Sequence, residues 1–165
     1  MPELERITTE YNKVEDRIRL AGESAGEANV IWLTQRLLNR LLPVLLGWLE
    51  RRGGDIPRGD MLLGFAQDAA MAEMVPQAPV TADSKCPLWL AMTVDVEQGE
   101  EWVRLRFRGE GSHEPATLTL SAKQMRQWLA ILQNAWGKAG WPMDLWPEWI
   151  GKRSTAVIRP EVIVH

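Results

Sequence analysis

A strict alternation of apolar and polar residues runs from Leu88 to Phe107 and predicts a β-hairpin. The expected inward positions are Leu88, Leu90, Met92, Val94, Val96, Val103, Leu105 and Phe107. A two-residue turn at 98–99 pairs Val94 with Val103 and places every inward residue opposite another. This match fixes the expected register, because a one-residue slip would turn the apolar set toward water.

A third strand and a helix follow the hairpin. Residues 116–120, ATLTL, continue the alternation, and Ser121 is a typical helix N-cap because its hydroxyl can accept from a free first-turn N–H. Gly137 and Gly140 are expected to end the helix. Its apolar stripe consists of Met125, Trp128, Leu129, Leu132 and Trp136. The segment therefore predicts three strands and then a helix, a βββα unit.

The same order occurs earlier, because residues 16–50 align without a gap with residues 103–137. Identical pairs include Arg17/Arg104, Arg19/Arg106, Leu33/Leu120, Leu42/Leu129 and Leu45/Leu132. Upstream of this stretch the match fades, although LERITTEY at 4–11 is typical of a strand. A unit of about 50 residues buries little apolar surface alone. We therefore predict an α+β fold in which two pseudo-symmetric βββα units, with antiparallel strands and helices packed on one sheet face, share a core about a pseudo-twofold axis.

The pattern divides the chain into four segments that together form one compact domain. Residues 1–52 are the first βββα unit, 53–86 a connector with a short helix over 61–74, and 87–140 the second unit. Residues 141–165 form a Trp-rich C-terminal tail, with a short β-like run in TAVI or EVIV. We expect Trp141, Trp146 and Trp149 to pack back on the body, because together they would make an adhesive exposed patch.

Composition favours a cytoplasmic globular protein. The 165 residues are 45% hydrophobic and 25% charged, with a net charge of −3. Cys86 is the single cysteine, so no internal disulfide forms and a reducing compartment is expected. The N-terminus lacks the apolar segment of a signal peptide, and the apolar run 41–49 is too short to span a bilayer.

Catalytic chemistry has little support in the sequence. The two histidines, His113 and His165, form no zinc-ligand spacing with the cysteine, and no phosphate-binding loop is present. Ser24 in GESAG does not lie in a GxSxG nucleophile elbow, and no neighbouring residue in the sequence is a candidate general base that could activate its hydroxyl. Glu23, Glu27, Glu110 and Glu114 recur in equivalent loops, where solvated turn residues are the simpler interpretation. We therefore expect no catalytic residue, metal or cofactor and favour a non-enzymatic role, with an enzyme of unidentified class as a third alternative.

The outward positions of the strands suggest a binding face. It consists of Arg17, Arg19, Trp32, Trp89, Trp102, Arg104, Arg106 and Arg108, with Trp89 expected across from Arg108. Aromatic rings on which bases stack, next to guanidinium groups that bind phosphates, are typical of single-stranded nucleic-acid platforms. The strand-to-helix segment ATLTLSAKQMRQWLAIL is similar to the end of a repeat in the PUR-alpha and Whirly families. Those repeats carry four strands where three are predicted here, and the resemblance implies binding of single-stranded DNA or RNA.

The same face also suits a protein partner. Asp95, Glu97, Glu100 and Glu101 lie near the arginines and reduce their net charge, and the connector helix or the tail could cover the face. Our first hypothesis is therefore an interaction module that binds a protein, or another copy of itself, through this face or the Trp-rich tail. The alternative is a single-stranded nucleic-acid binder that uses the same face. Neither hypothesis involves a membrane.

Overall fold

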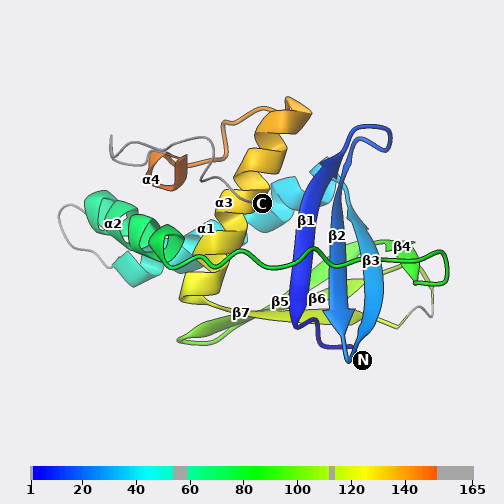
Figure 1. The fold of residues 1–165 in the computed structure, drawn as a ribbon. Helices are drawn as coiled ribbons and strands as arrows, with labels where there is room; N and C mark the ends of the chain where they lie inside the picture. The colour runs from blue at the N-terminus through cyan, green and yellow to red at the C-terminus, as the bar shows by residue number, and fades with distance from the viewer. Residues whose placement is uncertain (1, 54–58, 112–113, 152–165) are drawn as a thin grey trace.

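Two groups of antiparallel strands, each followed by a long helix, confirm the predicted α+β class and the βββα order (Figure 1). The computed structural model describes residues 2–53, 59–111 and 114–151. The first group is β1 (Arg6–Asn12), β2 (Arg17–Ser24), β3 (Glu27–Leu33) and α1 (Gln35–Gly53). The second group is β5 (Thr93–Gln98), β6 (Trp102–Arg108), β7 (Ala116–Ser121) and α3 (Ala122–Ala139). Between and after them lie α2 (Gly59–Ala72), β4 (Leu88–Leu90) and α4 (Glu148–Gly151).

The long strand predicted from residue 88 divides between two sheets. β4 joins the first sheet, in the order β1-β2-β3-β4, by running parallel to β3, whereas β5 belongs to the second sheet, β5-β6-β7. The chain changes sheets within one peptide: the N–H of Ala91 donates to the Trp32 carbonyl, and the N–H of Met92 donates to the Arg108 carbonyl. The inward assignment of Leu88 and Met92 is therefore wrong, because they are 62% and 53% exposed.

The predicted register of the β5–β6 hairpin is also wrong. Val94 lies opposite Phe107 rather than Val103, and the N–H of Gly99 donates to the carbonyl of Trp102, so the turn is at 100–101. The two-residue turn length is as predicted, but its position moves by two residues. This even shift keeps the inward residues of β6 in the core, where Val103, Leu105 and Phe107 are each fully buried.

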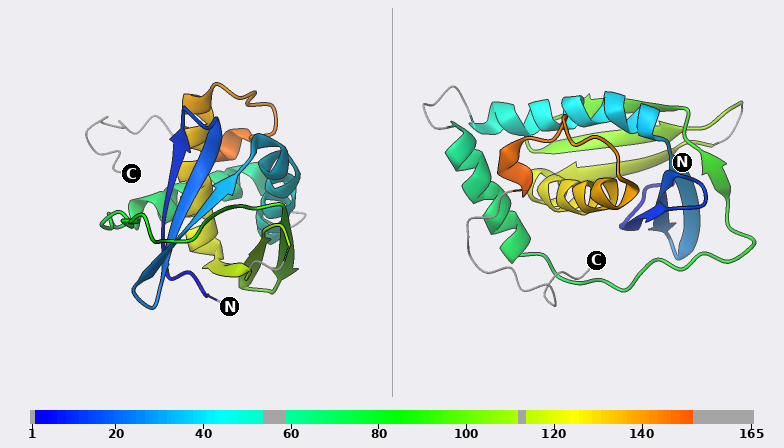
Figure 2. Two further views of the ribbon diagram at one scale, coloured as in Figure 1. Left: turned by 90° about the vertical axis from the view of Figure 1, so that its right-hand side faces the viewer. Right: turned by 90° about the horizontal axis from the view of Figure 1, so that it is seen from above.

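The two groups interlock, because each long helix packs on the first strand of the other group. α3 lies across β1, and α1 contacts β5 (Figure 2). The indole N–H of Trp128 on α3 donates to the Thr9 hydroxyl, and that of Trp48 on α1 donates to the Gly99 carbonyl, both at 3.0 Å. The two helices and the inner faces of both sheets thus share a single large hydrophobic core.

Two backbone hydrogen bonds at corresponding places link the two groups. The N–H of Thr117 in β7 donates to Pro2, and that of Val30 in β3 donates to Pro87, both at 2.9 Å. Each donor lies five residues before the first residue of its helix, and each acceptor immediately precedes a short segment that pairs with a strand of the other group. Residues 2–4 thus contact β7 of the second group through the Glu3–Thr117 bridge, and β4 pairs with β3 of the first group.

The gapless alignment does not hold on the central strands. Leu33 and Leu120 both precede a helix N-cap, but Leu33 pairs with Ile18 and Leu120 pairs with Val103. Val103, and not Leu105, is therefore the counterpart of Ile18. The turn before β6 is two residues shorter than the turn before β2, and the loop after β6 is correspondingly longer.

The caps of α3 follow the sequence prediction closely. The Ser121 hydroxyl accepts from the N–H of Gln124, and the Gln124 side chain accepts from the N–H of Ser121, which completes a capping box. At the other end Gly140 adopts a left-handed φ of 73° as the C-cap. Gly137 lies within the helix, so of the two predicted terminating glycines only Gly140 ends it.

Candidate functional site

The predicted binding face is divided between two sheets. Arg17, Arg19 and Trp32 lie on β2 and β3 of the first sheet, whereas the remaining arginines and Trp102 lie on β6 of the second sheet. The face is therefore not one continuous platform.

Trp89 does not belong to either outer face. It lies on β4, opposite Ile31, and is 7% exposed within the core. Its indole N–H donates to Asn29 Oδ1 at 2.7 Å. The prediction that Trp89 points outward across from Arg108 is wrong, because Arg108 pairs with Thr93 in the other sheet. The phase of the alternation changes where the chain leaves the first sheet, so Trp89 faces inward.

The connector covers part of the first sheet's outer face, and in Figure 1 it crosses in front of β1, β2 and β3. Val80 packs with Ala21 and Val30 in a small second core on this outer side. The N–H of Val80 donates to the Thr8 hydroxyl at 2.8 Å, and Arg6 donates to the carbonyl of Ala78 at 2.7 Å. The connector thus covers the Ala21 and Val30 row of the outer face and leaves the row of Arg19 and Trp32 partly exposed.

The second-sheet outer face carries Trp102, Arg104, Arg106 and Arg108 on β6, next to acidic residues on β5. Arg108 Nε lies 2.5 Å from Asp95 Oδ2, and Arg104 Nη1 lies 3.4 Å from Glu97 Oε2. The Arg104 guanidinium is also 5.2 Å from the ring centroid of Trp102. Arg106 has no ion pair within the described part of the chain. Two of the three arginines are thus partly neutralised, which leaves a face of small net positive charge.

The tryptophans of the tail pack back on the body, as predicted. Trp141, Trp146 and Trp149 are 6%, 9% and 7% exposed. Trp141 and Trp146 each make an edge-to-face contact with Trp136 of α3. These indoles are part of the core and are not available as a docking element. The β-like run TAVI or EVIV lies outside the described residues.

The α2 outer face, which sequence reasoning did not identify, is defined here as Met61, Leu62, Phe65, Ala69 and Ala72. Its three large side chains are 52%, 44% and 61% exposed. The opposite side of α2 packs on the body through Leu63, Gln67 and Ala70. By contrast, α1 and α3 present charged and polar residues outward, such as Arg36, Arg40, Lys123 and Lys138. The available signal was that ten of the twelve residues at 61–72 are Met, Leu, Phe, Ala or Gly, more than one buried stripe requires.

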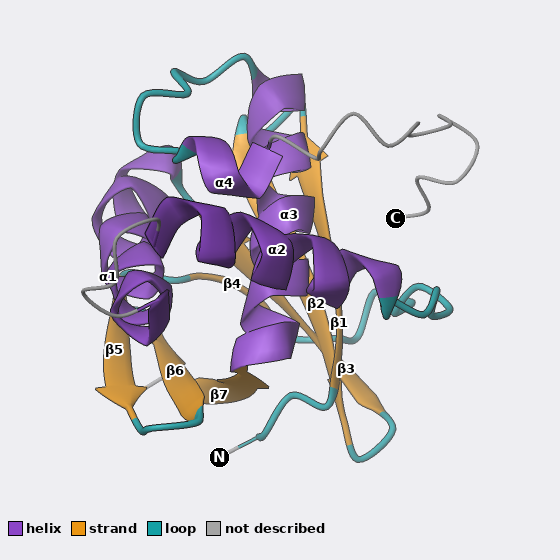
Figure 3. Ribbon diagram, turned by 90° about the vertical axis from the view of Figure 1, so that its left-hand side faces the viewer, coloured by secondary structure: helices purple, strands orange, loops and turns teal. Residues whose placement is uncertain are grey.

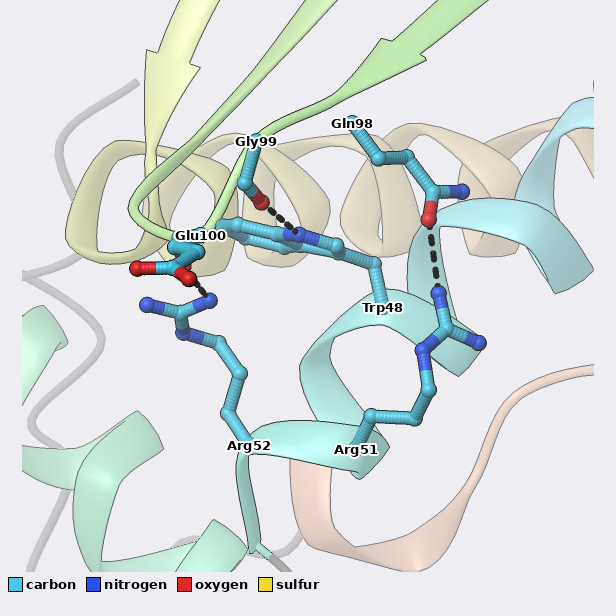
Figure 4. Close-up of a pocket in the computed structure, with 6 residues that line it drawn as sticks. All are labelled: Trp48, Arg51, Arg52, Gln98, Gly99 and Glu100. Atoms are coloured by element: carbon cyan, nitrogen blue, oxygen red, sulfur yellow. Dashed lines mark hydrogen bonds between the residues drawn. The ribbon is translucent and has the colours of Figure 1, made fainter.

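A pocket of about 640 Å³ lies where the end of α1 meets the β5–β6 turn (Figure 4). Arg51 donates to Gln98 Oε1 at 2.8 Å, and Arg52 donates to the Glu100 carbonyl. The Arg52 guanidinium lies 4.5 Å from the Trp48 ring centroid and 3.0 Å from Glu101. These contacts use much of the hydrogen-bonding capacity of the pocket to attach the turn to the helix.

Three groups have shifted pKa values, each with a structural cause. The Asp16 carboxylate accepts from the Tyr11 hydroxyl at 2.6 Å and raises the pKa of Tyr11. Hydrogen bonds from the N–H of Lys85 and the side chain of Cys86 lower the pKa of Asp83. Burial, together with the nearby positive charge of Arg52, lowers the pKa of Arg126.

The residues considered for catalysis are dispersed or lie outside the description. His113 and His165 lie outside the described residues. Glu23 pairs with Arg6 at 2.7 Å, and the Cys86 thiol donates to Asp83 in the connector. Among the described residues, no three His, Cys, Asp or Glu side chains gather in a way that could hold a metal ion. Within the same part of the chain, every helix is too short or too polar to cross a bilayer.

Comparisons with known proteins identify no relative. No family model, curated protein or solved structure matches the chain. The surfaces of the chain itself are therefore the basis for its proposed function.

Proposed function

We propose that this protein is a non-enzymatic interaction module that binds a protein partner on the α2 outer face. The observation that carries the proposal is the exposure of Met61, Leu62 and Phe65 on successive turns of one helix. Contiguous apolar patches of this kind are typical of interaction sites, whereas isolated exposed apolar residues are ordinary. Figure 3 shows α2 lying across α3 with its other side open.

Charge complementarity defines the chemistry of the partner. α2 contains Asp60 and Asp68 and no Lys or Arg, and Glu73 follows its last residue. Glu73 is 3.4 Å from Lys123, an exposed pair of small energetic weight. An acidic border around an apolar stripe favours an amphipathic segment with an apolar face and basic flanks. The partner is therefore expected to be such a segment of another protein.

A photo-crosslinking amino acid at position 65 tests the proposal. Phe65 is 61% exposed on α2, and Val14, 95% exposed in the β1–β2 turn, is the matched control. We expect a discrete intermolecular adduct from position 65 and none from position 14, with a basic amphipathic peptide at the crosslink. An adduct with a second copy would identify the partner as this chain itself. Crosslinking only to residues 152–165 of the same chain, or no adduct, would reject the proposal.

We propose the cytoplasm as the compartment, because the single cysteine of the chain can form no internal disulfide. Cys86 donates to Asp83 Oδ1 at 3.4 Å and has no disulfide partner. A reducing compartment keeps such a thiol free. Fractionation of cells that express the tagged full chain would test this placement.

Single-stranded nucleic acid on the second-sheet outer face is a second candidate function. It is supported by Arg106, which has no ion pair among the described residues, and by the Arg104–Trp102 contact. Phosphate contacts would give an affinity that falls steeply with salt. The double variant R104A/R106A should then lose oligonucleotide binding, whereas R36A on α1 should retain it. Absence of binding by the unmodified protein at low salt would eliminate this candidate.

A further inference from the structure

Arg126 is a buried cation without a matching anion. It lies on α3, is 6% exposed, and its Nη1 donates to the Leu63 carbonyl at a long 3.4 Å. It forms no ion pair with any described carboxylate. A buried guanidinium has five N–H donors, and leaving a charge uncompensated in the interior costs several kcal/mol, on the order of 3–5 when a partner is removed. Packing against uncharged groups does not compensate this charge, so Arg126 is a candidate ligand for an anion.

The surroundings of Arg126 add a second positive charge and an aromatic wall. Arg52 of α1 is near enough that its charge contributes to the lowered pKa of Arg126. The guanidinium of Arg126 is 5.8 Å from the ring centroid of Trp149 on α4. The four helices that supply Arg52, Leu63, Arg126 and Trp149 gather on one side of the molecule (Figure 3).

A buried acceptor lies on the same turn of α2. The Gln67 side-chain amide donates to the backbone carbonyl of Arg126 at 2.9 Å, while its Oε1 is buried without a donor among the described residues. An unsatisfied buried acceptor costs about 1–3 kcal/mol. A ligand that combines negative oxygens with an O–H would satisfy both Arg126 and Gln67.

We propose that the junction of α2, α3 and α4 binds a phosphate group that carries an O–H, with Arg126 as its guanidinium ligand and Gln67 Oε1 as the acceptor of that O–H. Arginine is suited to this role because its planar fork donates two parallel hydrogen bonds to phosphate oxygens. Phosphate retains an O–H at neutral pH that can donate to Gln67 Oε1, whereas sulfate does not. The site is independent of the α2 outer face, because Leu63 and Gln67 lie on the opposite side of that helix.

Denaturant unfolding of the full chain in inorganic phosphate tests the site, with sulfate and chloride at matched ionic strength as comparisons. At a phosphate concentration ten times the dissociation constant, the unfolding equilibrium constant should fall about tenfold. Sulfate should have a smaller effect and chloride none. A monoester such as phenyl phosphate is mostly a dianion without an O–H near neutral pH, so its effect should be smaller than that of phosphate and should increase as the pH is lowered toward about 6.

Two substitutions separate phosphate binding from packing. R126M removes the charge but keeps much of the volume, so it should abolish the phosphate effect while leaving the protein as stable as, or more stable than, the original in phosphate-free buffer. R36M, at an exposed arginine on α1, should leave the response unchanged. R126K should reduce the response, because lysine keeps the charge and loses the fork.

Three results would overturn the proposal. The first is an equal response of the unmodified protein and R126M to phosphate. The second is equal stabilisation by sulfate and phosphate, which would indicate a non-specific effect of ionic charge. The third is a loss of stability in D55N or E161Q that R126M cancels, since the chain itself would then supply the anion to Arg126.

Discussion

Two substitutions, two residues apart on α2, measure which of its sides is packed. Leu63 is 4% exposed, so L63A should lower the free energy of unfolding by about 2–5 kcal/mol. Phe65 is 61% exposed, so only roughly two fifths of its side chain is covered. Complete burial of Phe is worth about 1.5–3 kcal/mol, which gives about 0.6–1.2 kcal/mol for that fraction. The higher helix propensity of alanine offsets about 0.5 kcal/mol of this loss. F65A should therefore lower the free energy of unfolding by less than about 0.7 kcal/mol.

The assay is urea unfolding followed by tryptophan fluorescence, with identical m-values required of the three proteins. The larger side chain is thus expected to give the smaller loss of stability, by a margin of more than about 1 kcal/mol. F65A should nevertheless remove the crosslink expected from the α2 outer face when the probe is placed at Met61. If F65A and L63A were equally destabilising, Phe65 would be packed within the chain, and the basis of the proposed docking surface would be wrong.

Three further predictions concern the caps, a close contact and a titrating group. S121A should reduce the free energy of unfolding by about 0.5–2 kcal/mol, because the capping box loses its hydroxyl acceptor; an unchanged urea midpoint would contradict this. G99A should cost about 1–3 kcal/mol and alter the near-ultraviolet circular dichroism, because the added Cβ would lie 2.4 Å from the Trp102 ring; a native spectrum at full stability would count against the contact. D16N should lower the pKa of Tyr11 toward its ordinary value of 10.0, followed by tyrosinate absorbance, and asparagine tolerates the left-handed φ of 53° at this position. Because the folded-state pKa of Tyr11 is raised, its contribution to stability is complete below the ordinary value and is lost as the pH rises through the folded-state pKa; an unshifted pKa in D16N would refute the assignment.

The elements were predictable where the determining interactions are local. Ser121 and Gln124 form the capping box within one turn of α3, and Thr34 likewise accepts from the N–H of Leu37 at 3.1 Å. The period-two pattern of β6 and the helical stripe of α3 fix which side of each element is buried. No knowledge of distant neighbours is needed for such assignments.

Pairing partners were not predictable in the same way. The alternation from Leu88 to Val96 is nearly continuous, but it contains no information about which strand lies beside each half. The peptide between Ala91 and Met92 joins different sheets because the two strand groups exchange their leading segments. The turn before β6 is two residues shorter, and the loop after it two residues longer, than the corresponding connections of β2. The gapless alignment does not reveal these changes, because a shift of two residues leaves the inward and outward positions unchanged.

The candidate surfaces depended still more on distant packing. Alternation assigned Arg104, Arg106 and Arg108 to an outer face, but only the structure separates them from Arg17 and Arg19. The connector helix was expected from the sequence, yet its apolar residues do not indicate which side meets the core. Arg126 lies within an otherwise ordinary helical stripe, and its burial results from α2 and α4, which lie far from it along the chain.

The sequence by itself determined the α+β class, the order of strands before each long helix, the caps of α3 and the inward side of β6. Periodicity and capping depend on residues a few positions apart, which is why these features could be derived without coordinates. Only the tertiary structure decided the exchange between the two strand groups, the apolar face left open on α2 and the burial of Arg126 on α3 against α2 and α4. Those features depend on which remote surfaces cover one another, and that coverage is a property of the whole fold.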